Sequence, residues 1–308
     1  MEFRKIIGFG KSSFVISLPK NWTVRNNLQK GDILYLREED QTLVLSAKEK
    51  RLVKEPKKIV IRTDSKSVEK IQAEIVAAYL SNYDIFEIKG INLKDNSPEI
   101  KKIIRNLAGI ELLEQDSSKI LAKDLMDTRE ISIETIIRRI DIIIRSMIKD
   151  SMSSLHEDFY DSIFHRDIDI NRLVFLVKRV IKSAFSDQHT AKKLGRSSLE
   201  LLKDWNVVSL LESIGDEIKR IAREFKYANA KYIKELKKMN NALGEHYFAL
   251  MKAYHTKKPE AAYTVELGHK KRIEMLEKLE KKTKETKLIN HMKTLEANLK
   301  NMARGIMA

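Results

Sequence analysis

Two carboxylates spaced four residues apart are the side chains of this sequence best placed to do chemistry. Glu212 and Asp216 lie in the segment NVVSLLESIGDEIKRIA at 206–222, whose apolar residues recur at helical intervals. At about 100° per residue, both carboxylates lie on nearly the opposite face of the helix from the apolar one. Like charges at this spacing destabilise a helix slightly, so a compensating cation is expected. That cation is either a metal ion or the basic side chains on the same helix, and the spacing alone favours the basic side chains, which are Lys219, Arg220 and Arg223.

A second candidate for chemistry is the run GFGKSSFVISLPK at 8–20, whose Gly-Lys-Ser core matches the end of a phosphate-binding loop. Such a loop needs a glycine five residues before Gly10 and a helix after the core. Position 5 is Lys5. The residues after the core are aromatic and β-branched up to Pro19, which is typical of a strand. The sequence therefore argues against a nucleotide-binding loop.

Other groups able to act as nucleophiles or metal ligands are not clustered. The chain has no cysteine, which excludes disulfides, thiolate metal sites and cysteine nucleophiles. Its seven histidines are scattered without metal-ligand spacing. Serine is plentiful, but no serine is part of a nucleophile elbow. We therefore expect no catalytic residue and no enzymatic activity.

Composition favours an acidic partner. The chain has 308 residues and a formal net charge of +15, which favours polyanions such as nucleic acid. Many lysines crowd the last part of the chain, however, where helical charge runs are usually a solvated face. No segment approaches about 20 consecutive apolar residues and the N-terminus lacks a signal peptide, so we expect a cytoplasmic protein.

The N-terminal region predicts a small β unit. Strands are expected at 3–7, 13–18, 33–37 and 43–45, and a short helix at 21–28 has Pro19 before it and Gly31 after it as start and stop signals. Four short strands and one short helix bury too little apolar surface to be stable alone. We therefore expect this unit to pair with a second copy.

The same region resembles a known family of DNA-binding domains. The run KSSFVISLPKNW at 11–22, followed by LQKGD at 28–32, resembles the SpoVT/AbrB-like domain in its archaeal form, and the resemblance spans residues 1–54. It implies an intertwined, dimeric β barrel of swapped hairpins that binds double-stranded DNA. It also implies that DNA is contacted by basic residues near strand ends and the helix start, which are Arg4, Lys5, Lys11, Lys20 and Arg25.

A charged segment, AKEKRLVKEPKK at 47–58, predicts a linker to a second region in which strands and helices alternate. Strands are expected at 58–62, 85–88, 110–113 and 120–122, and helices at 67–80 and 98–107. This pattern predicts a small α/β domain in which two helices cover one sheet. We expect this domain to act as a spacer or as a dimerisation domain.

From about residue 130 onward the pattern is almost entirely helical, and Gly and Pro are nearly absent. Helices are expected at 131–155, 167–185, 190–225 with a bend at Gly195, 228–254, 259–282 and 287–307. Short loops between them predict an antiparallel bundle, made of two three-helix halves. The chain is therefore predicted to be a multidomain α+β protein, with domains at 1–54, 55–127 and 128–308.

Within this bundle, LESIGDEIKRIA at 211–222 resembles the signature of PhoU proteins, whose repeated three-helix halves carry a Glu-x-x-x-Asp pair that binds metal clusters on the bundle surface. The resemblance implies that Glu212 and Asp216, with Asp167 from the preceding helix, hold a divalent or iron-type metal in the first half. The sequence departs from the family where Asn171 replaces an acid. Lys293 and Ala297 also stand where the second half would supply its Glu and Asp. The resemblance therefore implies at most one metal site.

The combination of an AbrB-like domain and a PhoU-like bundle in one chain resembles archaeal phosphate-uptake regulators. This resemblance implies a homodimeric, DNA-binding transcriptional regulator of phosphate homeostasis, whose bundle senses metal and phosphate or binds phosphate transport or signalling proteins. An alternative is a dimeric adaptor that does not bind DNA and docks on a phosphate transporter or sensor kinase. A third hypothesis, a hydrolase that uses a metal at Glu212 and Asp216, has the least support.

Overall fold

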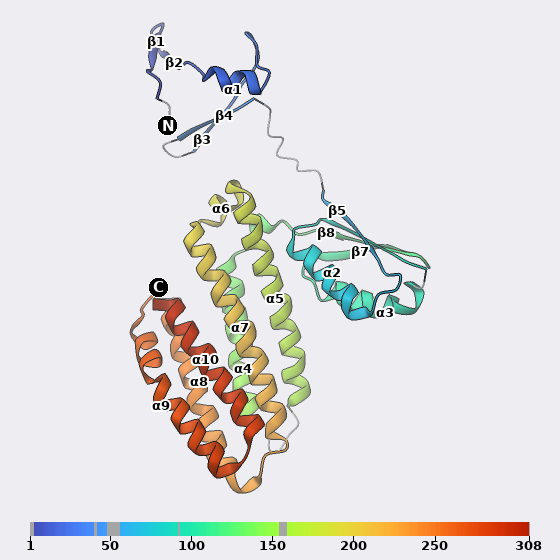
Figure 1. The fold of residues 1–308 in the computed structure, drawn as a ribbon, viewed down its shortest axis with the longest axis vertical. Coiled ribbons are helices and arrows are strands. Elements are labelled where there is room, and N and C mark those ends of the chain that lie inside the picture. The colour runs from blue at the N-terminus through green and yellow to red at the C-terminus, as the bar shows by residue number, and fades with distance from the viewer. Residues whose placement is uncertain (1–2, 40–41, 48–55, 92, 154–158, 308) are drawn as a thin grey trace. The chain divides into compact units, whose positions relative to one another are not determined.

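The computed structural model describes residues 3–39, 42–47, 56–91, 93–153 and 159–307 (Figure 1). It divides the chain into two compact units, Met1–Glu55 and Pro56–Ala308. The α/β region and the helical region therefore belong to one unit. The finer division at residues 54 and 127 stays a prediction.

The N-terminal unit consists of two hairpins and one short helix. Strand β1 (Ile7–Phe9) pairs antiparallel with β2 (Ser13–Val15), and β3 (Tyr35–Glu39) pairs antiparallel with β4 (Thr42–Ser46). Helix α1 (Lys20–Arg25) lies between the hairpins in sequence. The GKSS run is the turn and first residue of β2, and the turn is possible because Gly10 adopts a positive φ of 70°. No helix follows the turn directly, which agrees with the argument against a nucleotide loop.

Two features of this unit differ from the predicted barrel. The first strand lies at Ile7–Phe9 instead of 3–7, because the turn that begins at Gly10 sets the hairpin register. The described residues form two separate two-stranded sheets and no closed barrel within one chain. None of them is buried. A barrel would need strands from elsewhere.

The α/β region forms a four-stranded sheet in the order β5-β6-β8-β7. Strand β5 (Lys58–Arg62) runs parallel to β6 (Ile85–Lys89), whereas β8 (Lys119–Asp124) is antiparallel to both β6 and β7 (Ile110–Gln115). Helices α2 (Val68–Leu80) and α3 (Leu93–Arg105) pack their apolar residues into the core of this region, as predicted. Helix α3 begins before its predicted start at Pro98, because the fully buried Leu93 anchors an additional turn.

The helical region begins with α4 (Ile133–Ser153), α5 (Tyr160–Ser186), α6 (Gln188–Leu194) and α7 (Ser198–Phe225). It continues with α8 (Ile233–Thr256), α9 (Glu260–Thr283) and α10 (Thr286–Met307), and short 3-10 turns lie at Thr128–Glu130 and Ala230–Tyr232. The predicted helix at 190–225 is two helices instead of one bent helix. Gly195 adopts a left-handed φ of 60° after α6, and Ser197 and Glu200 form a capping box that starts α7.

Helices α4, α5 and α7 form the first half of the bundle, and α8, α9 and α10 form the second (Figure 1). Their apolar stripes merge into one core that runs through both halves. The α/β region is joined to the bundle by Arg179 of α5, which is 2 % exposed. Its guanidinium lies 2.5 Å from Asp124 and 4.4 Å from the ring centroid of Tyr79. No helix in the described part of the chain is long and apolar enough to cross a membrane.

Candidate functional site

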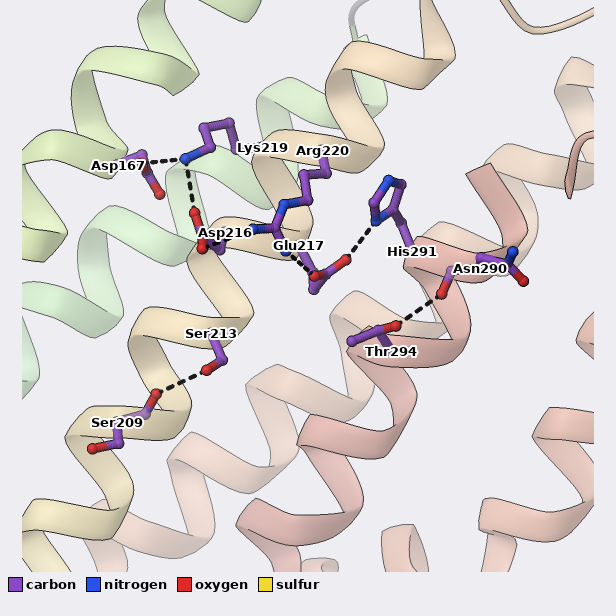
Figure 2. Close-up of polar contacts among 10 residues, drawn as sticks. All are labelled: Asp167, Ser209, Ser213, Asp216, Glu217, Lys219, Arg220, Asn290, His291 and Thr294. Carbon is purple, nitrogen blue, oxygen red and sulfur yellow. Dashed lines mark hydrogen bonds and ion pairs between the residues drawn. The ribbon is translucent and has the colours of Figure 1, made fainter. Parts of the chain in front are cut away.

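The three predicted metal ligands lie along the contact between α5 and α7, and Figure 2 shows two of them, Asp167 and Asp216. Gly215 positions them, because a Cβ atom at this residue would lie 3.0 Å from Cδ1 of Ile170. The missing side chain lets α5 approach α7 closely. Asp167 lies one turn before Ile170 on α5, and it is therefore brought to the face of α7 that carries Asp216.

A lysine ammonium stands between the two aspartates. Nζ of Lys219 lies 2.5 Å from Oδ2 of Asp167 and 2.7 Å from Oδ1 of Asp216 (Figure 2). The side chain of Asp167 is 6 % exposed, whereas that of Asp216 is 32 % exposed. Lys219 therefore compensates one buried and one half-buried carboxylate at once, and ties α5 to α7.

The pKa shifts of this pair follow from burial and charge. Burial raises the pKa of Asp167, and the hydrogen bond from Lys219 opposes that rise. Burial alone would lower the pKa of Lys219, but the hydrogen bonds to the two aspartates outweigh it, so that this pKa is raised. The ammonium is therefore held in its charged form between the two carboxylates.

Glu212 is compensated separately. Nζ of Lys178 on α5 lies 3.4 Å from its carboxylate, and the side chain of Glu212 is 34 % exposed. The structure thus brings Asp167 and Asp216 to one cation, and pairs Glu212 with another.

The charged network continues from α7 to the second half of the bundle. Arg220 donates a hydrogen bond of 3.1 Å to Asp216 and a second one to Glu217. Glu217 is 4 % exposed, and its other oxygen lies 2.8 Å from Nδ1 of His291 on α10 (Figure 2). Arg223, the third basic side chain considered from the sequence, pairs with Glu224 instead. Ion pairs therefore connect α5 to α7, and the contact between Glu217 and His291 continues to α10.

These contacts do not fit a resident metal. Among the described residues, no group of three or more histidine or acidic side chains is arranged to hold a metal ion. Each predicted ligand pairs with a lysine or arginine, and an ammonium between two carboxylates repels a second cation. In the second half, Lys293 pairs with Glu280 at 2.6 Å, and Ala297 supplies no ligand atom. The metal at Glu212, Asp216 and Asp167 stays a prediction.

The five basic residues predicted to contact DNA are all exposed. Arg4 and Lys5 precede β1, Lys11 lies in the turn before β2, and Lys20 and Arg25 are the first and last residues of α1. Nε of Arg25 donates a hydrogen bond to the carbonyl oxygen of Asn21, which holds its guanidinium along the helix. Their DNA contacts stay a prediction.

Two buried acids were missed by the sequence analysis. Asp141 and Asp204 are 5 % and 4 % exposed, and they accept hydrogen bonds from the hydroxyl groups of Tyr247 and Tyr254. The sequence contained a signal for Asp204. It falls three residues after Leu201 and three before Val207, on the apolar face of its helix. An acid at such a position must find a buried partner.

Comparison with known families finds the PhoU domain at residues 137–225, from the first turn of α4 to the end of α7. This part of the chain is PhoU-like. The match coincides with the first half of the bundle, including all three carboxylates discussed above, and it does not extend to the N-terminal unit. No curated protein and no solved structure matches the chain. The PhoU match supports a role in the regulation of phosphate homeostasis, together with phosphate transport or signalling proteins.

Proposed function

We propose that this protein is a cytoplasmic, non-enzymatic transcriptional regulator of phosphate homeostasis that binds DNA as a homodimer. Two N-terminal units would form one AbrB-like barrel that contacts double-stranded DNA. The PhoU-like bundle would adjust that contact in response to phosphate status or to a transport or signalling partner.

The observation that carries the proposal is the exposed apolar surface of the N-terminal unit. The exposed fraction of those large apolar residues that face solvent ranges from 39 % at Val44 to 87 % at Phe3. Apolar exposure of this extent is typical of an interaction site. Among the residues of this unit whose burial is described, none is buried, so they form no core of their own, and a second copy would supply one. The exposed residues include Phe3, Ile7, Phe9, Phe14, Ile33, Leu36 and Leu43.

The shape of the unit agrees with a swapped dimer. Isolated two-stranded hairpins are marginal in water, and their free edges pair readily with other strands. The unit also contains a hollow of about 430 Å³ whose walls include Leu18, Trp22 and Leu45. An apolar side chain of a second copy would fill this hollow. Pairing of the hairpins from two chains would then close the barrel that one chain lacks.

The basic residues of the unit supply the attraction to DNA. Lysine and arginine side chains displace the counterions condensed on the phosphate backbone, which gives a salt-dependent affinity. Dimerisation would double the number of such contacts and place them on one surface. Contacts of this kind set the position on the duplex, and only a few side chains would then specify bases.

The test is a DNA-binding titration with the full chain and a fragment of its own upstream region, at several salt concentrations. Replacing Arg4, Lys5 and Arg25 by Ala should weaken binding and lower the slope of log affinity against log salt by about one for each lost phosphate contact. A matched variant with Lys281, Lys284 and Lys287 replaced by Ala removes the same charge from the bundle, and it should bind as the wild type does. Equal affinity of both variants would contradict the proposal.

A second candidate function is a dimeric adaptor that docks on a phosphate transporter or signalling protein without binding DNA. It is favoured by the limits of the PhoU match, which covers the first half of the bundle and leaves the N-terminal unit unmatched. It predicts a stable dimer that shows no salt-dependent affinity for the upstream fragment. Both functions predict a dimer in sedimentation, so the salt-dependent DNA titration separates them.

A further inference from the structure

A cavity of about 330 Å³ lies at one end of the bundle. It forms where the first turns of α4, α7 and α9 meet the last turns of α8 and α10, so both halves contribute to its walls. We call it the Arg196 cavity. Its charged lining consists of Arg196, Lys203, Lys257, Glu134, Glu200 and Asp204. None of these residues belongs to the network around Lys219.

Asp204 presents an unused acceptor at this cavity. Its residue is 4 % exposed, and one carboxylate oxygen accepts a hydrogen bond of 3.0 Å from the hydroxyl group of Tyr254. The other oxygen, Oδ2, has no hydrogen-bond donor among the described residues. Nearly all buried polar atoms in folded proteins are hydrogen-bonded. Oδ2 is therefore an acceptor for a donor that enters the cavity.

Arg196 forms loose ion pairs with Asp204 and Glu200, but its guanidinium makes no hydrogen bond to either. Its Nε lies 3.6 Å from Oδ2 of Asp204, and its nearest guanidinium nitrogen to Glu200 lies 3.8 Å away. Both distances exceed a hydrogen bond. Glu200 instead accepts hydrogen bonds from the backbone and hydroxyl of Ser197, at 2.8 and 2.9 Å. The guanidinium fork, which suits a carboxylate in a bidentate arrangement, is thus available to a ligand.

The balance of charge limits what that ligand can be. The lining holds three basic and three acidic side chains, and burial lowers the pKa of the adjacent His255, which keeps its ring neutral. A ligand with net charge would disturb this balance. A ligand that carries one anionic and one cationic group satisfies Arg196 and Asp204 together.

We propose that the Arg196 cavity binds a free α-amino acid. Its carboxylate would accept hydrogen bonds from the guanidinium of Arg196, and its ammonium would donate to Oδ2 of Asp204. Nε of Arg196 and Oδ2 of Asp204 lie 3.6 Å apart, so the ligand must carry its anionic and its cationic group close together. The α-amino and α-carboxyl groups meet that requirement. Because helices of both halves line the cavity, the bound amino acid would bridge them.

The test is calorimetric titration of the full-length protein with the individual common amino acids. At least one should bind saturably. The hydroxy acid with the same side chain keeps the carboxylate but lacks the ammonium, and the corresponding amine lacks the carboxylate. Each analogue should bind more than about 100-fold more weakly, because it leaves a buried charged group without a partner. This comparison uses the wild-type protein only and does not depend on the folding of a variant.

Two variants locate the site. Arg196→Gln and Asp204→Asn should each abolish binding of the amino acid that the wild type binds. Arg223→Gln, a matched change at an exposed arginine near the other end of α7, should leave binding unchanged. The proposal is overturned if no amino acid binds, if the analogues bind as well as the amino acid, or if binding survives in either Arg196→Gln or Asp204→Asn. None of these outcomes depends on DNA binding, so they test the cavity independently of the proposed regulator function.

Discussion

Replacing Lys219 by Met removes the cation between Asp167 and Asp216 and keeps most of the aliphatic side chain. Asp167 is then left with a buried negative charge, because its side chain is only 6 % exposed and the lysine is the partner 2.5 Å away. Asp216 is affected less, since it is half-exposed and retains its hydrogen bond from Arg220. The expected loss of stability therefore arises mainly at Asp167.

The size of that loss follows from the exposure of the pair. Removing one partner of a buried ion pair costs about 3–5 kcal/mol, whereas exposed pairs contribute about 0–1 kcal/mol. The lysine side chain is 19 % exposed, so water replaces part of the lost interaction. We expect the free energy of unfolding to fall by about 2–3 kcal/mol. In a cooperative unit of this size, that corresponds to a fall in melting temperature of about 4–12 °C.

Urea and thermal unfolding of the full chain measure this change. Lys282→Met is the matched control, because its ion pair with Glu235 is exposed and its loss should cost less than about 1 kcal/mol. In the double variant with Asp167→Asn, no buried charge remains, so most of the stability should return. A Lys219→Met protein as stable as the control, or a double variant no more stable than Lys219→Met, would refute the assigned role of the lysine.

The same variant tests the predicted metal site. Removing the ammonium leaves two carboxylates facing each other, which favours a hard divalent cation between them. Mn²⁺ should therefore raise the melting temperature of Lys219→Met and leave that of the wild type unchanged. If Mn²⁺ stabilises the wild type to the same extent, the carboxylates bind metal in spite of the lysine.

Three further outcomes are expected. Arg179→Met leaves Asp124 buried without its cation and should cost about 3–5 kcal/mol at neutral pH. Because burial already raises the pKa of Asp124, this deficit should shrink as pH falls and the carboxyl becomes protonated in both states, which urea unfolding across pH will show. Gly109→Ala should cost about 2 kcal/mol or more in the same assay, since φ is 82° and the new Cβ would lie 2.7 Å from Cβ of Met126. Phe14→Asp should convert the proposed dimer to monomers in a sedimentation experiment, whereas Leu267→Asp, a change at an α9 residue that is also 80 % exposed, should not.

Helical periodicity in the sequence was sufficient to predict the helical C-terminal region, and the structure confirms it. The error at 190–225 had a local cause. The Ser-x-x-Glu pattern at Ser197 and Glu200 is a helix start signal, and it begins two residues after Gly195, which can end a helix. Both signals were present in the sequence, but the apolar pattern continued across them and concealed the break.

The arrangement of strands could be predicted less well, because strand order and register depend on pairing between distant residues. The local pattern placed strands near 58–62 and 85–88, but it did not indicate that they are parallel neighbours. In the N-terminal unit, the turn at Gly10 decides where β1 lies. The effect of that turn on the register became visible only with the hairpin formed.

In the candidate site, too, contacts within one helix could be predicted from the sequence, whereas a contact between helices could not. The sequence identified Lys219 and Arg220 as groups able to neutralise Asp216, because all three lie on one helix within a turn. It did not indicate that Lys219 also reaches Asp167, since that contact depends on how closely α5 packs on α7. The missing side chain of Gly215 sets that approach.

The compensated charges around Lys219 limit where a variable signal can enter the bundle. A lysine is covalently part of α7, so the bridge it makes to α5 does not depend on the supply of a metal ion. Arg220 and Glu217 extend the same compensation to His291 of α10. A ligand changes a conformational equilibrium only through groups with which it interacts differently in the two states. The Arg196 cavity offers such groups, because an acceptor and a guanidinium there lack hydrogen-bond partners within the described residues. We therefore expect a ligand whose supply differs between conditions to act at the Arg196 cavity, where the two halves meet. The Lys219 bridge keeps the first half intact.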